Sequence, residues 1–115
     1  MKGLISCTVT VMVSNLDKAI KFYVETLGLE LKNRYGENYA EIQCPGLTIG
    51  LHPVEDEVNW GNNLSIGFGV NNFDDLTKSL MNKDVKLEIK QDGWIRLAHF
   101  KDLDNNHLYL AELKE

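Results

Sequence analysis

Residues 11–23, VMVSNLDKAIKFY, join a strand pattern directly to a helix pattern. The run that leads into them, 7–13, is β-branched and partly alternating, which predicts a strand. Asn15 is a suitable helix N-cap because its side-chain oxygen can accept a free backbone N–H. Apolar side chains then recur at helical spacing over 16–26, and Gly28 is placed to end the helix in a left-handed conformation. The segment therefore predicts a strand followed at once by a helix.

The same order of elements occurs twice along the chain. Three further strands are predicted in the first half, at 29–35, 38–44 and 46–52. In the second half a strand is predicted at 64–70, a helix capped by Asn71-Asn72 at 73–82, and strands at 85–90, 94–100 and 107–112. Aligning Thr8 with Ser65 also aligns Asn15 with Asn72, which indicates an internal repeat. We expect an α+β fold of two βαβββ modules: module one 1–53, a polar linker 54–63, and module two 64–115, together forming one domain over 1–115.

Composition narrows the function classes. The 115 residues include 17 acidic and 12 basic side chains, a net charge of −5, which disfavours nucleic acid and anionic membranes as partners. No run approaches the ~18 apolar residues of a membrane span, and the start of the chain has too short an apolar stretch for a secretory signal. Cys7 and Cys44 have neither metal-type nor disulfide-framework spacing, and we expect Cys7 to be buried. A cytoplasmic protein is expected.

Two signatures carry a family resemblance. The first is 11–23, running on to Leu27-Gly28-Leu29. The second is 100–110, FKDLDNNHLYL, where Leu103 and Asn105 stand for a Pro and a Gly of the family pattern. Together they resemble the vicinal oxygen chelate superfamily, which includes glyoxalase I, extradiol dioxygenases and bleomycin resistance proteins. The resemblance implies that the two sheets curl into a cup, mixed and mostly antiparallel, with the helices outside. It also implies a homodimer.

The alternation of side chains along the strands separates the two faces of each sheet. Apolar residues such as Val13, Ile49 and Phe100 belong to the helix side, so the polar positions face the cup. The ligand-binding candidates are Thr10, Met12, Glu41, His52, Trp60, Ser65, Leu97, His99 and Tyr109. Trp60 and Trp94 suit an aromatic rim, plain packing or a dimer interface. Arg96 suits an anionic ligand or a surface pair with an acid.

Metal binding is not expected at the family's usual place. The resemblance implies that metal-dependent members hold the ion through four positions, which here are Thr8, Gly50, Ser65 and Tyr109. Hydroxyl and phenol groups are poor ligands beside imidazole or carboxylate, and glycine has no side chain. We therefore expect no metal and no other cofactor. A different metal site built from Glu41, His52 and His99 is the alternative.

These observations favour a metal-independent protein that binds a small organic molecule in the cup. The alternative is an enzyme of the same superfamily, a lyase, isomerase or dioxygenase, with a non-standard metal site or with Glu41 or His99 as a general base. Ser65 lacks the Gly-x-Ser-x-Gly setting of a nucleophile, and no catalytic residue is assigned. A third possibility is an interaction protein whose cup is filled by its own side chains.

Overall fold

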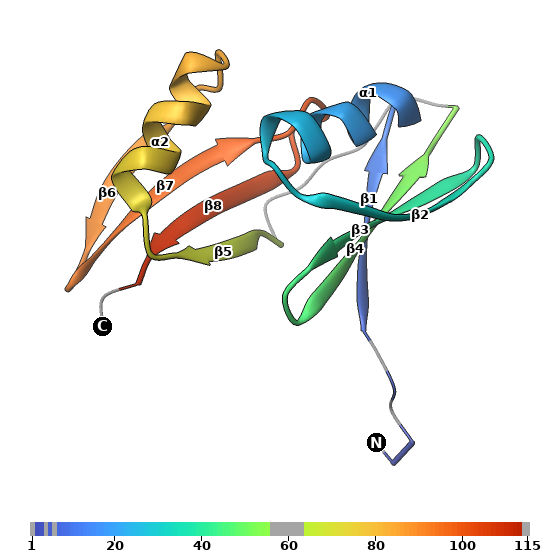
Figure 1. Ribbon diagram of the computed structural model, residues 1–115, viewed down its shortest axis with the longest axis horizontal. Coiled ribbons are helices and arrows are strands. Elements are labelled where there is room, and N and C mark those ends of the chain that lie inside the picture. Colours follow the sequence, from blue (N-terminus) through green and yellow to red (C-terminus); the bar gives the residue numbers. More distant parts are fainter. Residues whose placement is uncertain (1, 4, 6, 56–63, 114–115) are drawn as a thin grey trace. The chain divides into compact units, whose positions relative to one another are not determined.

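The computed structural model describes residues 2, 3, 5, 7–55 and 64–113. The chain divides into two compact units, Met1–Asn59 and Trp60–Glu115. Each unit has the order strand, helix, three strands, and each forms its own four-stranded mixed sheet (Figure 1). The predicted α+β fold of two βαβββ modules is confirmed. Most of the predicted linker, 56–63, lies outside the described residues.

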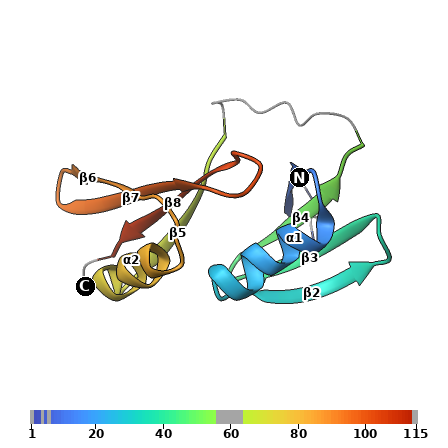
Figure 2. The ribbon, with the colours of Figure 1, turned by 90° about the horizontal axis from the view of Figure 1, so that it is seen from above.

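Unit one holds the first sheet, in the order β1-β4-β3-β2. Its strands are β1 (Thr8–Val13), β2 (Glu30–Tyr35), β3 (Tyr39–Cys44) and β4 (Leu47–Pro53). β1 runs parallel to β4, and the other neighbours are antiparallel. Helix α1 (Leu16–Lys21) packs on β3 and β4 (Figure 2). The residues buried between helix and sheet are Leu16, Ala19, Tyr23, Ala40, Ile42, Ile49 and Leu51.

The helix of unit one begins as predicted but changes its winding. The Lys18 N–H donates to Asn15 Oδ1 at 2.9 Å, which caps α1. After Lys21 the chain continues as a π-helical segment, η1 (Phe22–Thr26), and the Leu27 N–H donates to the Phe22 carbonyl at 3.0 Å. Gly28 then has φ +76°, the left-handed conformation expected there. Apolar spacing alone did not distinguish the α-helical from the π-helical part of 16–26.

Unit two holds the second sheet, in the order β5-β8-β7-β6. Its strands are β5 (Ile66–Val70), β6 (Glu88–Asp92), β7 (Ile95–Lys101) and β8 (His107–Glu112), and β5 runs parallel to β8. Helix α2 (Phe73–Asn82) packs on β8 (Figure 1). Asn72 occupies the N-cap position, but its side chain makes no capping hydrogen bond. The buried residues include Ile66, Phe73, Leu80, Ala98, Phe100, Leu108 and Leu110.

Two further predictions of local structure have opposite outcomes. Asn105, at the position where the resembled family pattern has a glycine, has φ +64° and so adopts the conformation predicted for it. Cys7 is exposed, not buried, because it precedes β1 and lies outside the sheet. None of the helical segments within 7–55 and 64–113 has the length and hydrophobicity that a membrane-spanning helix requires.

Candidate functional site

The register of unit one brings polar side chains from four strands onto one face. Thr10 and Glu41 are both Cα partners of Gly50, and Asn33 is the partner of Glu41. Directly paired residues lie on the same side of a sheet, so these positions form one row. We call this side, opposite α1, the open face of unit one. The predicted site residues Met12 and His52 are also partners on this face.

Tyr39 covers the centre of the open face. Its hydroxyl lies 3.3 Å from Thr10 Oγ1, and a Cβ atom added at Gly50 would collide with that hydroxyl. Its ring centroid is 6.1 Å from that of Tyr35 and 6.5 Å from that of His52. Gly50 therefore provides the space that the Tyr39 side chain fills. Tyr39 is not among the site residues predicted from the sequence, although it shares the strand parity of Glu41.

Glu41 is held by two neutral donors. The Asn33 Nδ2 group donates to Glu41 Oε1 at 3.0 Å, and the Tyr35 hydroxyl donates to the same oxygen at 3.2 Å. The hydrogen bond to the carboxylate and its negative charge raise the pKa of Tyr35 above its ordinary value, so this hydroxyl remains a donor at neutral pH. The carboxylate is half-buried and fixed in orientation.

The open face of unit two, opposite α2, carries a second tyrosine above a glycine. A Cβ atom at Gly67 would collide with the Tyr109 ring, and the His99 and Tyr109 ring centroids lie 5.7 Å apart. Leu97, half-buried, shares this face because it is the partner of Ala111. Ser65 is exposed and precedes β5, and Trp60 lies outside the described residues. Of the predicted candidates, unit two thus brings His99, Leu97 and Tyr109 together.

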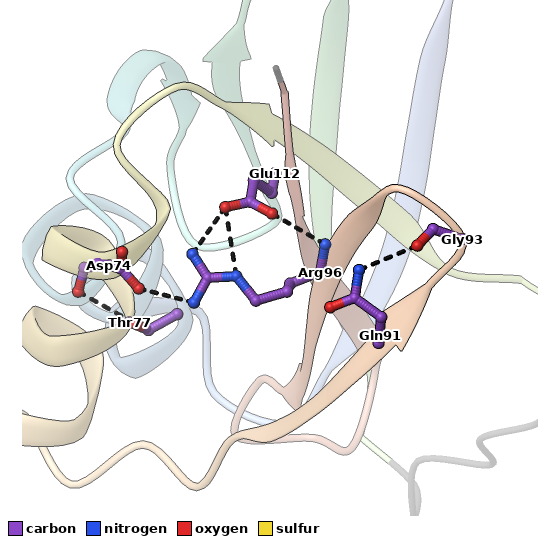
Figure 3. Close-up of polar contacts among 6 residues, drawn as sticks. All are labelled: Asp74, Thr77, Gln91, Gly93, Arg96 and Glu112. Atoms are coloured by element: carbon purple, nitrogen blue, oxygen red, sulfur yellow. Dashed lines mark hydrogen bonds and ion pairs between the residues drawn. The ribbon is translucent and has the colours of Figure 1, made fainter.

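Arg96 lies on the helix side of unit two and is neutralised there (Figure 3). Its guanidinium donates to Glu112 Oε2 at 2.7 Å and to Asp74 Oδ1 at 2.9 Å, and it lies over the Phe73 ring at 4.6 Å from the centroid. The hydrogen bonds to Glu112 and then to Asp74 raise the pKa of Arg96. Of the two predicted roles for Arg96, pairing with acids is the one the structure shows.

The residues at the four positions where the family resemblance implies metal ligands do not fit a divalent ion. In unit one Thr8 offers a neutral hydroxyl, and Gly50 offers only the space that Tyr39 occupies. In unit two Ser65 and Tyr109 offer a hydroxyl and a phenol, both weak ligands beside imidazole or carboxylate. Over 7–55 and 64–113, no cluster of three or more His, Cys, Asp or Glu residues has the arrangement of a metal site.

Neither cysteine thiol has a disulfide partner, and burial raises the pKa of the Cys44 thiol. A raised pKa keeps that thiol protonated and unreactive at neutral pH. The described part of the chain therefore presents hydrogen-bonding and aromatic groups on its open faces, and the buried Cys44 thiol is not activated.

Comparisons with known proteins agree on one family and one fold. The family model described as Glyoxalase/Bleomycin resistance protein/Dioxygenase superfamily matches residues 7–110. A solved structure of a member of that superfamily from Sphaerobacter thermophilus DSM 20745 is 26% identical, with a TM-score of 0.77 over 98% of this chain and 100% of that one. No curated protein matches the sequence.

Two other solved structures share the fold. TnmS3, an antibiotic binding protein from Streptomyces sp. CB03234, is 24% identical, with a TM-score of 0.78 over 99% of both chains. Lactoylglutathione lyase from Agrobacterium tumefaciens is 13% identical, with a TM-score of 0.77 over 96% of this chain and 93% of that one. One is a binding protein and the other an enzyme, so the fold alone does not choose between the two classes.

Proposed function

Because the chain belongs to the Glyoxalase/Bleomycin resistance protein/Dioxygenase superfamily, we propose that it is a metal-independent protein that binds a small organic molecule on the open faces of its sheets. The single observation that carries the proposal is the position of Tyr39 above Gly50. At a place where metal-dependent members hold their ion, this chain has no ligand side chain and an aromatic ring instead.

The chemistry of the open face of unit one supports binding. Thr10, Glu41 and Asn33 supply hydrogen-bonding groups, while Tyr35 and Tyr39 supply aromatic surface. A few fixed polar groups beside apolar and aromatic surface are typical of sites for small organic ligands. The name of the Streptomyces relative, an antibiotic binding protein, offers a precedent for such a role on this fold.

An enzyme is the second candidate, and the orientation of Glu41 is what favours it. A carboxylate fixed by two donors on one oxygen still has a second oxygen to accept a proton, as a general base must. In that case Glu41 or His99 would act in a lyase, isomerase or dioxygenase reaction. The lyase from Agrobacterium tumefaciens is the precedent for an enzyme on this fold.

The proposal includes a cytoplasmic homodimer, in which a second copy helps to enclose the ligand. The free thiols of Cys7 and Cys44 suit a reducing compartment. Exposed large apolar side chains, among them Met12, Ile89 and Trp94, suit burial against another copy of the chain.

Thermal melts of EDTA-treated protein test the proposal. We expect no shift on adding Mn²⁺, Fe²⁺, Co²⁺, Ni²⁺ or Zn²⁺, and an upward shift with some members of a panel of small aromatic compounds. A compound at a hundred times its dissociation constant stabilises the native state by about 2.7 kcal/mol, which is several degrees for a domain of this size. A large shift with one metal would overturn metal independence and favour the enzyme.

Two tyrosine variants locate any compound that binds. A ligand on unit one should lose its shift in Tyr39→Ala and keep it in Tyr109→Ala, because each variant uncovers the glycine of one unit only. A ligand on unit two should show the reverse. A compound whose shift survives in both variants would bind elsewhere and contradict the proposed site.

A further inference from the structure

Glu41 is a half-buried carboxylate whose contacts are all with neutral groups. Both of its hydrogen bonds, from Asn33 and Tyr35, end on Oε1. Within the described residues it takes part in no ion pair, and Oε2 accepts no hydrogen bond. A partly buried charge is less screened by water than an exposed one, so it interacts more strongly with a cation that reaches it.

Several other carboxylates of the chain have a cation beside them. Glu112 pairs with Arg96 at 2.7 Å and Glu88 pairs with Lys90 at 3.1 Å. Glu41 differs from these in having two amide or phenol donors and no positive charge. Glu41 therefore gives the open face of unit one a negative charge at a fixed place, with no cation paired to it among the described residues.

Aromatic rings lie on the same face as this carboxylate. Tyr35 touches Glu41 through its hydroxyl, and its ring is 6.1 Å from Tyr39, which in turn is 6.5 Å from His52. The face of an aromatic ring attracts an organic cation, and the attraction grows when the cation leaves water. We propose that the patch formed by Tyr35, Tyr39, Glu41 and His52 binds a small organic cation, a protonated or quaternary amine joined to a planar aromatic group. This rests on the proposed function and names the chemical class of its ligand.

Each part of such a ligand meets a different part of the patch. A protonated amine donates a charge-assisted hydrogen bond to Glu41 Oε2, which stays available because Asn33 and Tyr35 occupy Oε1. The planar group lies against the tyrosine rings. An anion is repelled by the carboxylate, and a neutral molecule of the same shape keeps only the aromatic contact.

The internal repeat provides a comparison within the molecule. In unit two the row that corresponds to Glu41 and Asn33 contains His99 and Glu88, which are Cα partners. There the carboxylate of Glu88 already pairs with Lys90. This row of unit two therefore lacks the uncompensated charge of Glu41, and the preference for a cation is expected in unit one.

Three probes of similar size and different charge test the inference on the 115-residue chain. They are 2-naphthylmethylamine, which is cationic at pH 7, 2-naphthylmethanol, which is neutral, and 2-naphthoate, which is anionic. Titration followed by amide and side-chain NMR shifts gives both the dissociation constant and the residues affected. We expect the amine to bind about tenfold more tightly than the alcohol, as one charge-assisted hydrogen bond predicts, with its shifts at Tyr35, Tyr39, Glu41 and His52.

Two variants that each remove one negative charge distinguish a direct contact of the amine with Glu41 from an effect of the net charge of the protein. Glu41→Gln should reduce the affinity for the amine to that for the alcohol, while Glu88→Gln, which removes the same charge from the corresponding row of unit two, should leave the tenfold preference intact. If Glu41→Gln fails to fold, the order of the three affinities on the unaltered protein still tests whether the patch prefers a cation.

Equal affinity for amine and alcohol, shifts confined to other residues, or no binding by the amine would each overturn the inference. The proposed function would survive these results if neutral or anionic compounds raise the melting temperature with the dependence on Tyr39 or Tyr109 described above. It would fail separately if a metal ion produced the shift.

Discussion

Asp102 is a buried carboxylate that organises the turn before β8. Its Oδ1 accepts hydrogen bonds from the backbone N–H groups of Asp104 and Asn106, both at 2.9 Å, and its Oδ2 accepts one from Asn106 Nδ2 at 2.8 Å. These bonds hold Asn105 at positive φ. The Asp side chain therefore maintains the turn even though this chain lacks the proline and glycine of the family pattern.

We expect Asp102→Ala to lower the free energy of unfolding by about 2–4 kcal/mol, because the half-buried backbone N–H groups of Asp104 and Asn106 lose this charged acceptor. Asp102→Asn keeps an oxygen for the backbone donors and loses the acceptor of Asn106 Nδ2, so its cost should be smaller. Urea unfolding followed by circular dichroism measures both. Equal stability of Asp102→Ala and the unaltered protein would show that the turn does not depend on this carboxylate.

The contact between Tyr35 and Glu41 predicts a pH effect at a single residue. The carboxylate raises the pKa of Tyr35 by accepting its proton in a hydrogen bond and by disfavouring the phenolate. Glu41→Gln removes the charge, so the pKa of Tyr35 should fall toward the ordinary tyrosine value. Titration of the ring carbon Cζ by NMR between pH 8 and 12 measures it.

Glu37→Gln is the control for this titration, because Glu37 is also near the β2–β3 turn but pairs with Arg34 and not with Tyr35. It should leave the pKa of Tyr35 nearly unchanged. If both variants shifted the titration equally, the raised pKa would reflect the general negative charge of the chain, and the hydrogen bond to Glu41 would not be its cause.

At the scale of secondary-structure elements, the two helices begin at equivalent asparagines that behave differently. Asn15 caps α1 with its side chain, whereas Asn72 at the same place in α2 does not. Asn15→Ala should therefore cost about 1 kcal/mol of stability, and Asn72→Ala should cost only a few tenths. Chemical denaturation of the two variants compares them directly, and an equal loss would contradict the capping geometry.

The order of the elements could be predicted because each strand and helix keeps its own apolar period. Strand ends differ from the prediction by a few residues. The sequence predicts a strand at 85–90, and β6 is found at Glu88–Asp92, because apolar alternation begins at Val85 before the sheet pairing does. The π-helical η1 was not predictable, since its buried side chains Phe22 and Tyr23 continue the spacing of α1. The spacing of apolar residues shows which face of a helix is buried, but it does not show which carbonyl each backbone N–H bonds.

The alternation of apolar and polar side chains along the strands also predicted part of the site. Glu41 and His52 follow from alternation, but Asn33 and Tyr35 belong to β2, where every residue is exposed and no apolar alternation marks the faces. A bulge between Leu31 and Asn33 also reverses the parity of that strand: Leu31 is paired with Ile42 on the helix side and Asn33 with Glu41 on the open face. The donors that orient Glu41 could be found only from the strand register.

At the scale of the whole molecule, the proposed homodimer makes the stability depend on protein concentration. Trp94, 89% exposed beside the β6–β7 turn, and Ile89, 47% exposed on β6, are large apolar groups that a second copy would shield. Association of native chains favours folding by mass action, so the melting temperature should rise with protein concentration. Sedimentation equilibrium should give twice the 13.1 kDa mass of one chain.

A variant at Trp94, the most exposed aromatic residue within the described part of the chain, identifies the surface involved. If β6 and its turn form the interface, Trp94→Gln should weaken self-association and remove most of the concentration dependence, while Met81→Gln, at an exposed apolar residue of α2 in the same unit, should not. A dimer that persists in Trp94→Gln would place the interface elsewhere. A monomer at every concentration, with a constant melting temperature, would mean that one chain binds its ligand alone.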